Sequence, residues 1–175
     1  MPHLVIIRGN SASGKTTAAR SLQLALGRGT ANIGQDHFRR VVLREHDVPH
    51  GDNIELINAT VRHCLAADYH VIAEGILIEA HYGVMLRQLI KDHRGPSPVF
   101  YLDVPLPETL RRHAGRPTMT VPADKLREWY VPYDTLGVAG EVVLEPTSCD
   151  HVVRAMQDRI GPVPIRTDLD QGRFL

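Results

Sequence analysis

The sequence is poor in several features that would point to particular classes of protein. It contains only two cysteines, Cys64 and Cys149, which lie far apart in the chain and form no C-x-x-C pattern. We therefore expect two reduced and buried thiols, as is usual in a cytoplasmic protein, rather than a disulfide framework.

An excess of positive charge is also missing. The 20 Lys and Arg residues balance the 20 Asp and Glu residues, so the formal net charge is zero. A polyanion would therefore have to bind at a local basic patch. Aromatic residues make up only 5% of the chain, and base-stacking surfaces need exposed aromatic side chains. Phe38, Trp129 and Tyr133 are candidates for such a surface, but each could equally belong to the core.

The chain has no long hydrophobic run. Its first residues hold only a short apolar stretch at residues 4–7, which fits neither a signal peptide nor a membrane span. Apolar residues still make up 43% of the 175 residues, enough for one compact domain with a sizeable core. We expect a soluble cytoplasmic protein with one domain over residues 1–160 and a C-terminal tail over residues 161–175.

Short apolar runs alternate along the chain with longer amphipathic stretches, a pattern typical of βαβ units around a parallel sheet. Strands are predicted at residues 4–7, 31–33, 71–73, 99–102 and 141–144. Helices are predicted at residues 15–26, 36–45, 54–67, 79–93, 107–114, 123–130 and 148–160. The sequence therefore predicts an α/β fold with a parallel sheet flanked by helices.

A phosphate-binding loop directly follows the first predicted strand. The stretch GNSASGKT at residues 9–16 fits the pattern G-x-x-x-x-G-K-[ST] and precedes a predicted helix. In this pattern Lys15 reaches the β- and γ-phosphates, and the Thr16 hydroxyl ligates Mg²⁺. The loop alone does not distinguish a kinase from an ATPase or GTPase. The residues expected to bind the nucleotide are Gly9, Asn10, Ser11, Ala12, Ser13, Gly14, Lys15, Thr16 and Thr17.

An acid and an arginine follow the second predicted strand. Asp36 and Arg39 are three residues apart, so they share a face if the segment is helical. The carboxylate could accept the proton of an attacking hydroxyl, and the arginine could hold an anionic group of the acceptor. The alternative is that Asp36 only caps the helix. His37 points to another face and is expected in solvent or behind the site.

The third predicted strand ends in Glu74-Gly75. An acid at this position can hold a water of Mg²⁺ or orient a group that binds the acceptor. It can equally make a structural hydrogen bond to the phosphate loop or to Thr16. Gly75 permits close approach of a substrate to the backbone at the strand end, where α/β proteins bind ligands.

A cluster of arginines follows the fourth predicted strand. Arg112 and Arg116 are four residues apart, so a helical turn would place them on one face. Such a pair can close over the triphosphate and offset charge on the transferring group. The alternative is a solvated basic face in which Glu108 pairs with Arg112.

Together these segments resemble the P-loop kinases that include phage polynucleotide 5′-kinase, zeta toxin and chloramphenicol phosphotransferase. The nearest likeness is to the kinase domain of the phage polynucleotide 5′-kinase, and it covers most of residues 4–140. It rests on the GNSASGKT loop, on the Asp-x-[aromatic]-Arg unit at residues 36–39 and on the run DVPLPETLRRHAGRPTMTVPADKLREWYVPYDTLG at residues 103–137. The resemblance implies a P-loop NTPase-type parallel sheet with a small helical arginine lid at about residues 111–130.

The resemblance also implies roles for single residues. Asp36 is the expected general base, Arg39 the contact to a phosphate on the acceptor, and Arg112 and Arg116 the lid arginines that bind nucleotide and assist catalysis. One departure concerns the acceptor side, because Glu74-Gly75-Ile76 stands where the phage kinase has Asp-Thr-Asn. The machinery of phosphoryl transfer therefore carries over better than the acceptor.

The function predicted from the sequence is transfer of the γ-phosphoryl group of ATP, with Mg²⁺, to a hydroxyl acceptor. We favour a polynucleotide 5′-hydroxyl or a nucleotide-like acceptor. A small metabolite or an antibiotic remains the alternative, supported by the neutral charge, the few aromatics and the altered strand end. A second alternative is a switch protein that hydrolyses ATP slowly and acts through a partner.

Overall fold

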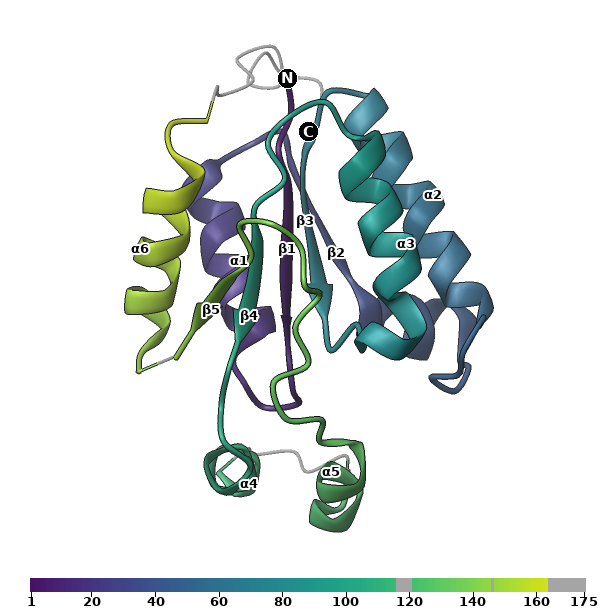
Figure 1. Ribbon diagram of the computed structural model, residues 1–175, viewed down its shortest axis with the longest axis vertical. Helices are drawn as coiled ribbons and strands as arrows, with labels where there is room; N and C mark the ends of the chain where they lie inside the picture. The colour runs from purple at the N-terminus through teal and green to yellow at the C-terminus, as the bar shows by residue number, and fades with distance from the viewer. Residues whose placement is uncertain (116–120, 146, 164–175) are drawn as a thin grey trace, which may run out of the picture.

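The protein is built from a parallel sheet with helices packed on both of its faces, as the computed structural model shows (Figure 1). The structure describes residues 1–115, 121–145 and 147–163. The strand order is β2-β3-β1-β4-β5, and every neighbouring pair is parallel. The strands are β1 Leu4–Gly9, β2 Thr30–Gly34, β3 His70–Gly75, β4 Val99–Leu102 and β5 Val142–Leu144. The predicted α/β class and its five strands are therefore confirmed.

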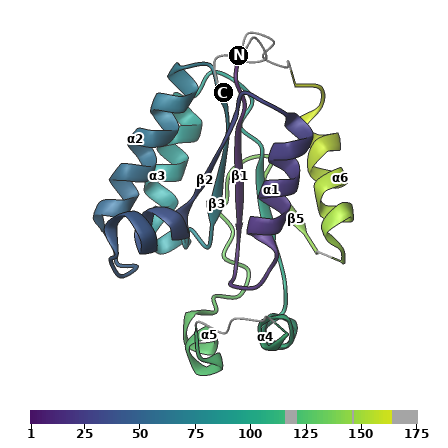
Figure 2. The ribbon, with the colours of Figure 1, turned by 180° about the vertical axis from the view of Figure 1, so that it is seen from behind.

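Amphipathic helices bury the sheet. One face is covered by α1 and α6, and the other by α2 and α3 (Figures 1 and 2). Successive side chains of a strand point to opposite faces, so Val5 and Ile7 pack in the cluster with α1 and α6, whereas Leu4 and Ile6 pack with α2 and α3. The helices are α1 Lys15–Leu26, α2 Asp52–Ala66, α3 Glu79–Asp92, α4 Leu106–Ala114, α5 Ala123–Trp129 and α6 Cys149–Ile160, with a π-helix η1 at His37–Leu43.

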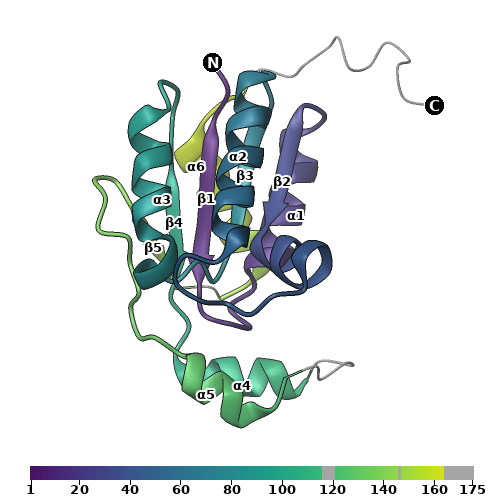
Figure 3. The same ribbon diagram turned by 90° about the vertical axis from the view of Figure 1, so that its right-hand side faces the viewer.

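All chain segments with predicted chemistry meet at the carboxyl edge of the sheet. The phosphate loop follows β1, η1 follows β2, and α4 follows β4. The helices α4 and α5 lie side by side beyond this edge, apart from the layers that cover the sheet (Figure 3). Ligands of parallel α/β sheets bind at the carboxyl ends of the strands, so this edge is where the site must be sought.

The segment after β2 differs from the α-helix predicted at residues 36–45. It is a π-helix, in which the N–H of Arg44 bonds to the carbonyl of Arg39. None of its residues is fully buried, although Phe38 packs against the core while partly exposed. Single π turns are frequent at functional sites, and this one still places Arg39 on the same side as Asp36, as predicted.

The other predicted helices agree with the structure to within two residues at each end. Ser148 is the predicted N-cap of α6, and its Oγ accepts a hydrogen bond of 3.2 Å from the N–H of His151. Both cysteines are free, but each is half-buried rather than buried as expected. Within the described part of the chain, no helix is both long and apolar enough to span a membrane.

Candidate active site

The phosphate loop curls between β1 and α1 because three of its residues adopt positive φ. These are Gly9 at +147°, Ala12 at +60° and Gly14 at +96°. A side chain at Gly9 would place a Cβ 2.6 Å from the carbonyl oxygen of Leu102 in β4, so only glycine fits between the two strands. A loop of this shape, continued by the N-terminus of α1, turns backbone N–H groups toward an anion.

Lys15 is held inside this loop. Its side chain is buried, and Nζ donates hydrogen bonds to the carbonyl of Asn10 at 2.7 Å and to Ser13 Oγ at 3.2 Å. The ammonium group therefore sits in the curve of the loop, where phosphate oxygens of a nucleotide would meet it.

Glu74 lies at the end of β3 beside Thr16. The Thr16 hydroxyl is 3.1 Å from Glu74 Oε1 and 3.2 Å from Oε2. Burial raises the pKa of the Glu74 carboxyl, while Lys15 and the Thr16 hydrogen bond act in the opposite direction. The structural hydrogen bond to Thr16, one of the two predicted roles, is therefore present.

The same pair of residues suits a magnesium ion. Hydroxyl and carboxylate oxygens are hard ligands, and Mg²⁺ takes its remaining positions from phosphate oxygens and water. Among the described residues, no group of three or more His, Cys, Asp and Glu side chains could hold a metal by itself. The donor set at Thr16 and Glu74 thus fits Mg²⁺ carried by a nucleotide better than a metal bound by protein alone.

Asp36 faces the same cleft as the phosphate loop. Its side chain is 66% exposed, and Oδ1 accepts from Arg39 Nη2 at 3.0 Å and from Arg40 Nε at 3.1 Å. It makes no side-chain capping bond to η1, so the helix-capping role is not what the structure shows. The cleft is lined by Ser11, Ala12, Gly14, Lys15, Thr16, Thr17, Asp36, Arg40, Glu74, Gly75, Ile76 and Trp129.

The two arginines beside Asp36 differ in their exposure and in whether they line the cleft. Arg39 is 14% exposed in its side chain, and its Nη1 is 3.4 Å from the carbonyl of Glu45. It therefore reaches Asp36 from behind the cleft. Arg40 is 39% exposed and lines the cleft. Sequence reasoning passed over Arg40, because the family pattern at residues 36–39 draws attention to its neighbour.

Arg112 on α4 reaches toward the phosphate loop. Its Nε is 2.6 Å from Glu108 Oε1, and its Nη1 is 3.5 Å from the carbonyl of Ser13. Arg111 binds the same carboxylate, and hydrogen bonds from Arg111 and Arg112 hold the pKa of Glu108 at about 2. The pairing with Glu108 that the alternative interpretation predicted is present, and Arg112 also lies next to the loop. Arg116, the other predicted lid arginine, lies outside the described residues.

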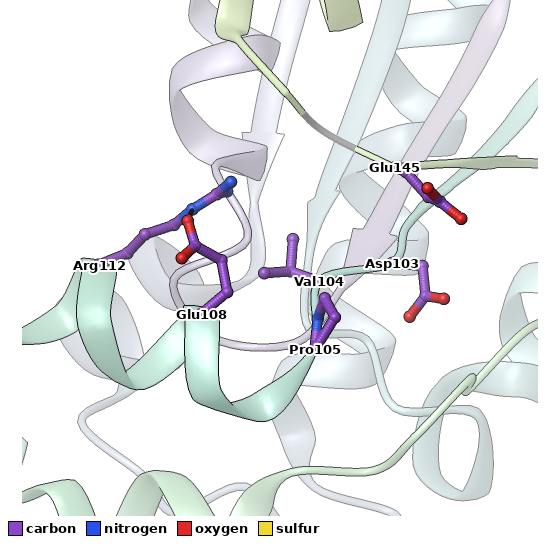
Figure 4. Close-up of a pocket in the computed structure, with 6 residues that line it drawn as sticks. All are labelled: Asp103, Val104, Pro105, Glu108, Arg112 and Glu145. Carbon is purple, nitrogen blue, oxygen red and sulfur yellow. Dashed lines mark hydrogen bonds and ion pairs between the residues drawn. The ribbon is translucent and has the colours of Figure 1, made fainter.

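A second cavity opens on the other side of the loop, between α4 and the N-terminus of α6. Its lining includes Gly14, Arg112 and Cys149. A third hollow adjoins it: Figure 4 shows Glu108 and Arg112 next to each other on α4, with Asp103 and Glu145 at the ends of β4 and β5. The phosphate loop is thus accessible from two sides, with Asp36 on one of them.

Two buried side chains next to the loop make contacts that the sequence did not predict. Arg8, the residue before Gly9, is fully buried, and its Nη2 is 2.8 Å from Asp134 Oδ2. Asn10 binds the backbone of Val131, two residues after the end of α5. An arginine within the apolar strand LVIIRG signals a buried partner, but nothing local identifies that partner.

A family model described as an AAA domain (AAA_33) matches residues 4–130. No curated protein sequence matches the chain.

Three solved structures share the fold. The first is a gluconokinase from Sinorhizobium meliloti 1021, with 17% identity, a TM-score of 0.66 and coverage of 91% of this chain and 93% of that one. The second is the Mycobacterium tuberculosis APS kinase in complex with AMPPNP and APS, with 20% identity, a TM-score of 0.69 and coverage of 91% and 97%. The third is a shikimate kinase from Acinetobacter baumannii in complex with shikimate, with 24% identity, a TM-score of 0.56 and coverage of 91% and 93%.

Proposed function

The chain belongs to the AAA_33 family of P-loop AAA domains, and from that premise we propose that it is an ATP-dependent kinase that phosphorylates a hydroxyl group. One observation carries the proposal. Asp36 lines the same cleft as Lys15 and Thr16, with its carboxylate exposed. A nucleotide hydrolase or switch needs the phosphate loop but no acid placed for an acceptor hydroxyl.

The geometry of the loop supports a binding mode for the nucleotide and its metal. The triphosphate would lie along the loop, with Lys15 at the β- and γ-phosphates. Thr16 would hold Mg²⁺ directly and Glu74 would hold it through water, and the bound ion offsets negative charge on the phosphates. The cavity between α4 and α6 leaves room for the nucleoside on the side of the loop away from Asp36.

The reaction follows from these positions. Asp36 takes the proton of the acceptor hydroxyl as its oxygen forms a bond to the γ-phosphorus, and the bond from that phosphorus to the β–γ bridging oxygen breaks to release ADP. Lys15, Arg112 and Arg116 stabilise the charge on the transferring group. Arg39 and Arg40 orient the Asp36 carboxylate, whose Oδ1 lies 3.0 Å from Arg39 Nη2 and 3.1 Å from Arg40 Nε.

For the acceptor, we propose a polynucleotide 5′-hydroxyl or a nucleotide-like molecule. The exposed Arg40 beside Asp36 supports it, because a guanidinium group binds a phosphate well. The APS kinase with the same fold was solved in complex with AMPPNP and APS. A small metabolite is the second candidate, and the gluconokinase and shikimate kinase with this fold favour it.

Asp36→Asn tests the kinase against the ATP-hydrolysing switch. Labelled ATP is incubated with 5′-hydroxyl oligonucleotides, nucleosides and hydroxylated small molecules, and transfer and ATP binding are both measured. We expect transfer to be lost while ATP binding is kept. Asp158→Asn, an exposed acid on α6, is the matched control and should behave as the wild type. Unchanged ATP turnover in Asp36→Asn would favour the switch.

A further inference from the structure

Trp129 is an apolar side chain left exposed beside the reaction site. It is the only tryptophan of the sequence and the last residue of α5. It is 43% exposed, and it lines the cleft that also holds Asp36 and Arg40. A large aromatic ring in such a position has apolar surface available to a ligand.

The packing of the lid does not account for this exposure. The buried residue of α5 is Leu126, which is 3% exposed and lies one turn before Trp129. The phosphate groups of ATP do not account for it either, because phosphate oxygens can accept a hydrogen bond from the indole N–H but gain nothing from the apolar faces of the ring. The ring is therefore available to whatever enters the cleft from the side of Asp36.

We propose that Trp129 stacks on the acceptor and that the acceptor therefore carries a nucleobase. This inference rests on the proposed kinase function. In this arrangement the base lies on the indole, an anionic group of the acceptor binds Arg40, and the hydroxyl reaches Asp36. Nucleobases stack on aromatic side chains whatever their sequence, since every base has a flat π face. A saturated sugar acid has no such face.

The single tryptophan makes the test direct, because fluorescence near 350 nm, the usual range for exposed indole, reports Trp129 alone. The full chain is titrated without ATP with a 5′-hydroxyl tetranucleotide, and separately with gluconate and with shikimate. We expect the tetranucleotide to quench the emission with a saturable curve, and gluconate and shikimate, which carry no nucleobase, to leave it unchanged. Quenching by the acids but not by the tetranucleotide would overturn the inference.

Substitution adds a kinetic test. Trp129→Ala should raise the KM for the tetranucleotide by roughly 10- to 100-fold, the size of one lost stacking contact, with little change in kcat. Trp129→Phe should recover most of the loss. Tyr133→Ala is the matched control, because Tyr133 is 61% exposed but does not line the cleft. An unchanged KM in Trp129→Ala, with folding verified by thermal melting, would also overturn the inference.

The outcomes separate this inference from the function on which it rests. Phosphorylation of a sugar acid that is indifferent to Trp129→Ala would retain the kinase and overturn the stacking role. Quenching by the tetranucleotide with no transfer to any acceptor would overturn the kinase function and support the base-binding surface.

Discussion

Asn10 in the phosphate loop is joined to the backbone of Val131 by two hydrogen bonds. Its Nδ2 donates to the Val131 carbonyl at 2.7 Å, and its Oδ1 accepts from the Val131 N–H at 3.0 Å. Val131 lies two residues after the end of α5. The backbone carbonyl of Asn10 also accepts from Lys15 Nζ at 2.7 Å. One residue of the loop thus contacts both Lys15 and the chain that follows α5.

Asn10→Ala should uncouple the lid from the phosphate loop. It removes both bonds to Val131 and the bond from Nδ2 to the Tyr101 hydroxyl, and a polar group left unsatisfied on burial costs about 1–3 kcal/mol. We expect a lower melting temperature and a fall in kcat of up to roughly 100-fold from misplacement of lid residues. Asn58→Ala, which removes an exposed amide on α2, is the control. Wild-type kcat in Asn10→Ala would show that the lid is positioned by other contacts.

The buried pair of Arg8 and Asp134 should be important for stability. Arg8 is fully buried, and its Nε and Nη2 also donate to the carbonyl of Leu77 at 3.0 and 2.9 Å. Burial lowers the pKa of the Arg8 guanidinium, and the nearby Asp134 and Glu141 carboxylates counteract this. Removing one partner of a buried ion pair leaves the other without compensation, at a cost of about 3–5 kcal/mol.

Chemical denaturation of Asp134→Ala measures this cost. The exposed pair of Arg62 and Asp92, at 2.8 Å, provides the control, and Asp92→Ala should leave the unfolding midpoint almost unchanged. Equal effects of the two substitutions would mean that the Arg8 charge is compensated by Glu141 and by the Leu77 carbonyl instead.

The fold and the phosphate loop could be predicted because each depends on a local pattern. The apolar run at residues 4–7 has the composition of a strand buried on both faces, and residues 9–16 match a motif with a fixed spacing. Parallel βαβ units do not by themselves determine the order of the strands in the sheet. That order depends on which strands pair, and so does the register of β1 with β3, in which Leu4 lies opposite Val71.

The remaining features of the site depend on tertiary contacts. Arg8 and Asp134 are separated by 126 positions in the sequence, and no periodicity connects them. The choice between Arg39 and Arg40 as the cleft residue depends on a π-helix whose wider turn cannot be read from propensities. From the sequence alone, Trp129 could lie in the core or on the surface. The structure decides, because Leu126 is the buried residue of α5 and Trp129 is left exposed.

Glu74 should make the stability of the nucleotide-free protein depend on pH. Its pKa is raised above the ordinary value of 4.5 by burial, so the folded state binds this proton more tightly than the unfolded chain does. The stability that this group contributes is present below the ordinary pKa and is lost as the pH rises through the folded value. Above the folded-state pKa, where the carboxylate is ionised, burial of its charge therefore counts against folding.

Glu74→Gln should remove this pH-dependent loss of stability. We expect the variant to melt at a higher temperature than the wild type at pH 7 without nucleotide, and the difference to shrink as the pH falls toward 4. In the presence of Mg²⁺ and ATP the order should reverse, because the variant lacks a carboxylate for the metal water. Glu55→Gln, a change of the same type on α2, is the control. A melting difference that does not change between pH 4 and pH 7 would contradict the assignment.

The lid arginines provide the sharpest test of phosphoryl transfer. Arg112 is held between Glu108 at 2.6 Å and the Ser13 carbonyl at 3.5 Å, which places its charge beside the phosphate loop. An arginine that stabilises the transferring group acts mainly in the transition state, so its loss lowers kcat more than it weakens nucleotide binding. The same role is predicted for Arg116.

Arg112→Ala and Arg116→Ala should each lower kcat by about 1,000-fold or more, the scale known for arginine fingers, with a much smaller change in ATP affinity. Single-turnover transfer and nucleotide binding by calorimetry separate the two effects. Arg127→Ala is the matched control, because Arg127 is an exposed arginine on α5 that pairs with Asp124 at 2.8 Å. If Arg112→Ala weakened ATP binding as much as it lowered kcat/KM, the arginine would serve only to bind nucleotide. Full turnover in Arg116→Ala would show that Arg116 does not assist phosphoryl transfer. Arg112 would then be the lid arginine that does.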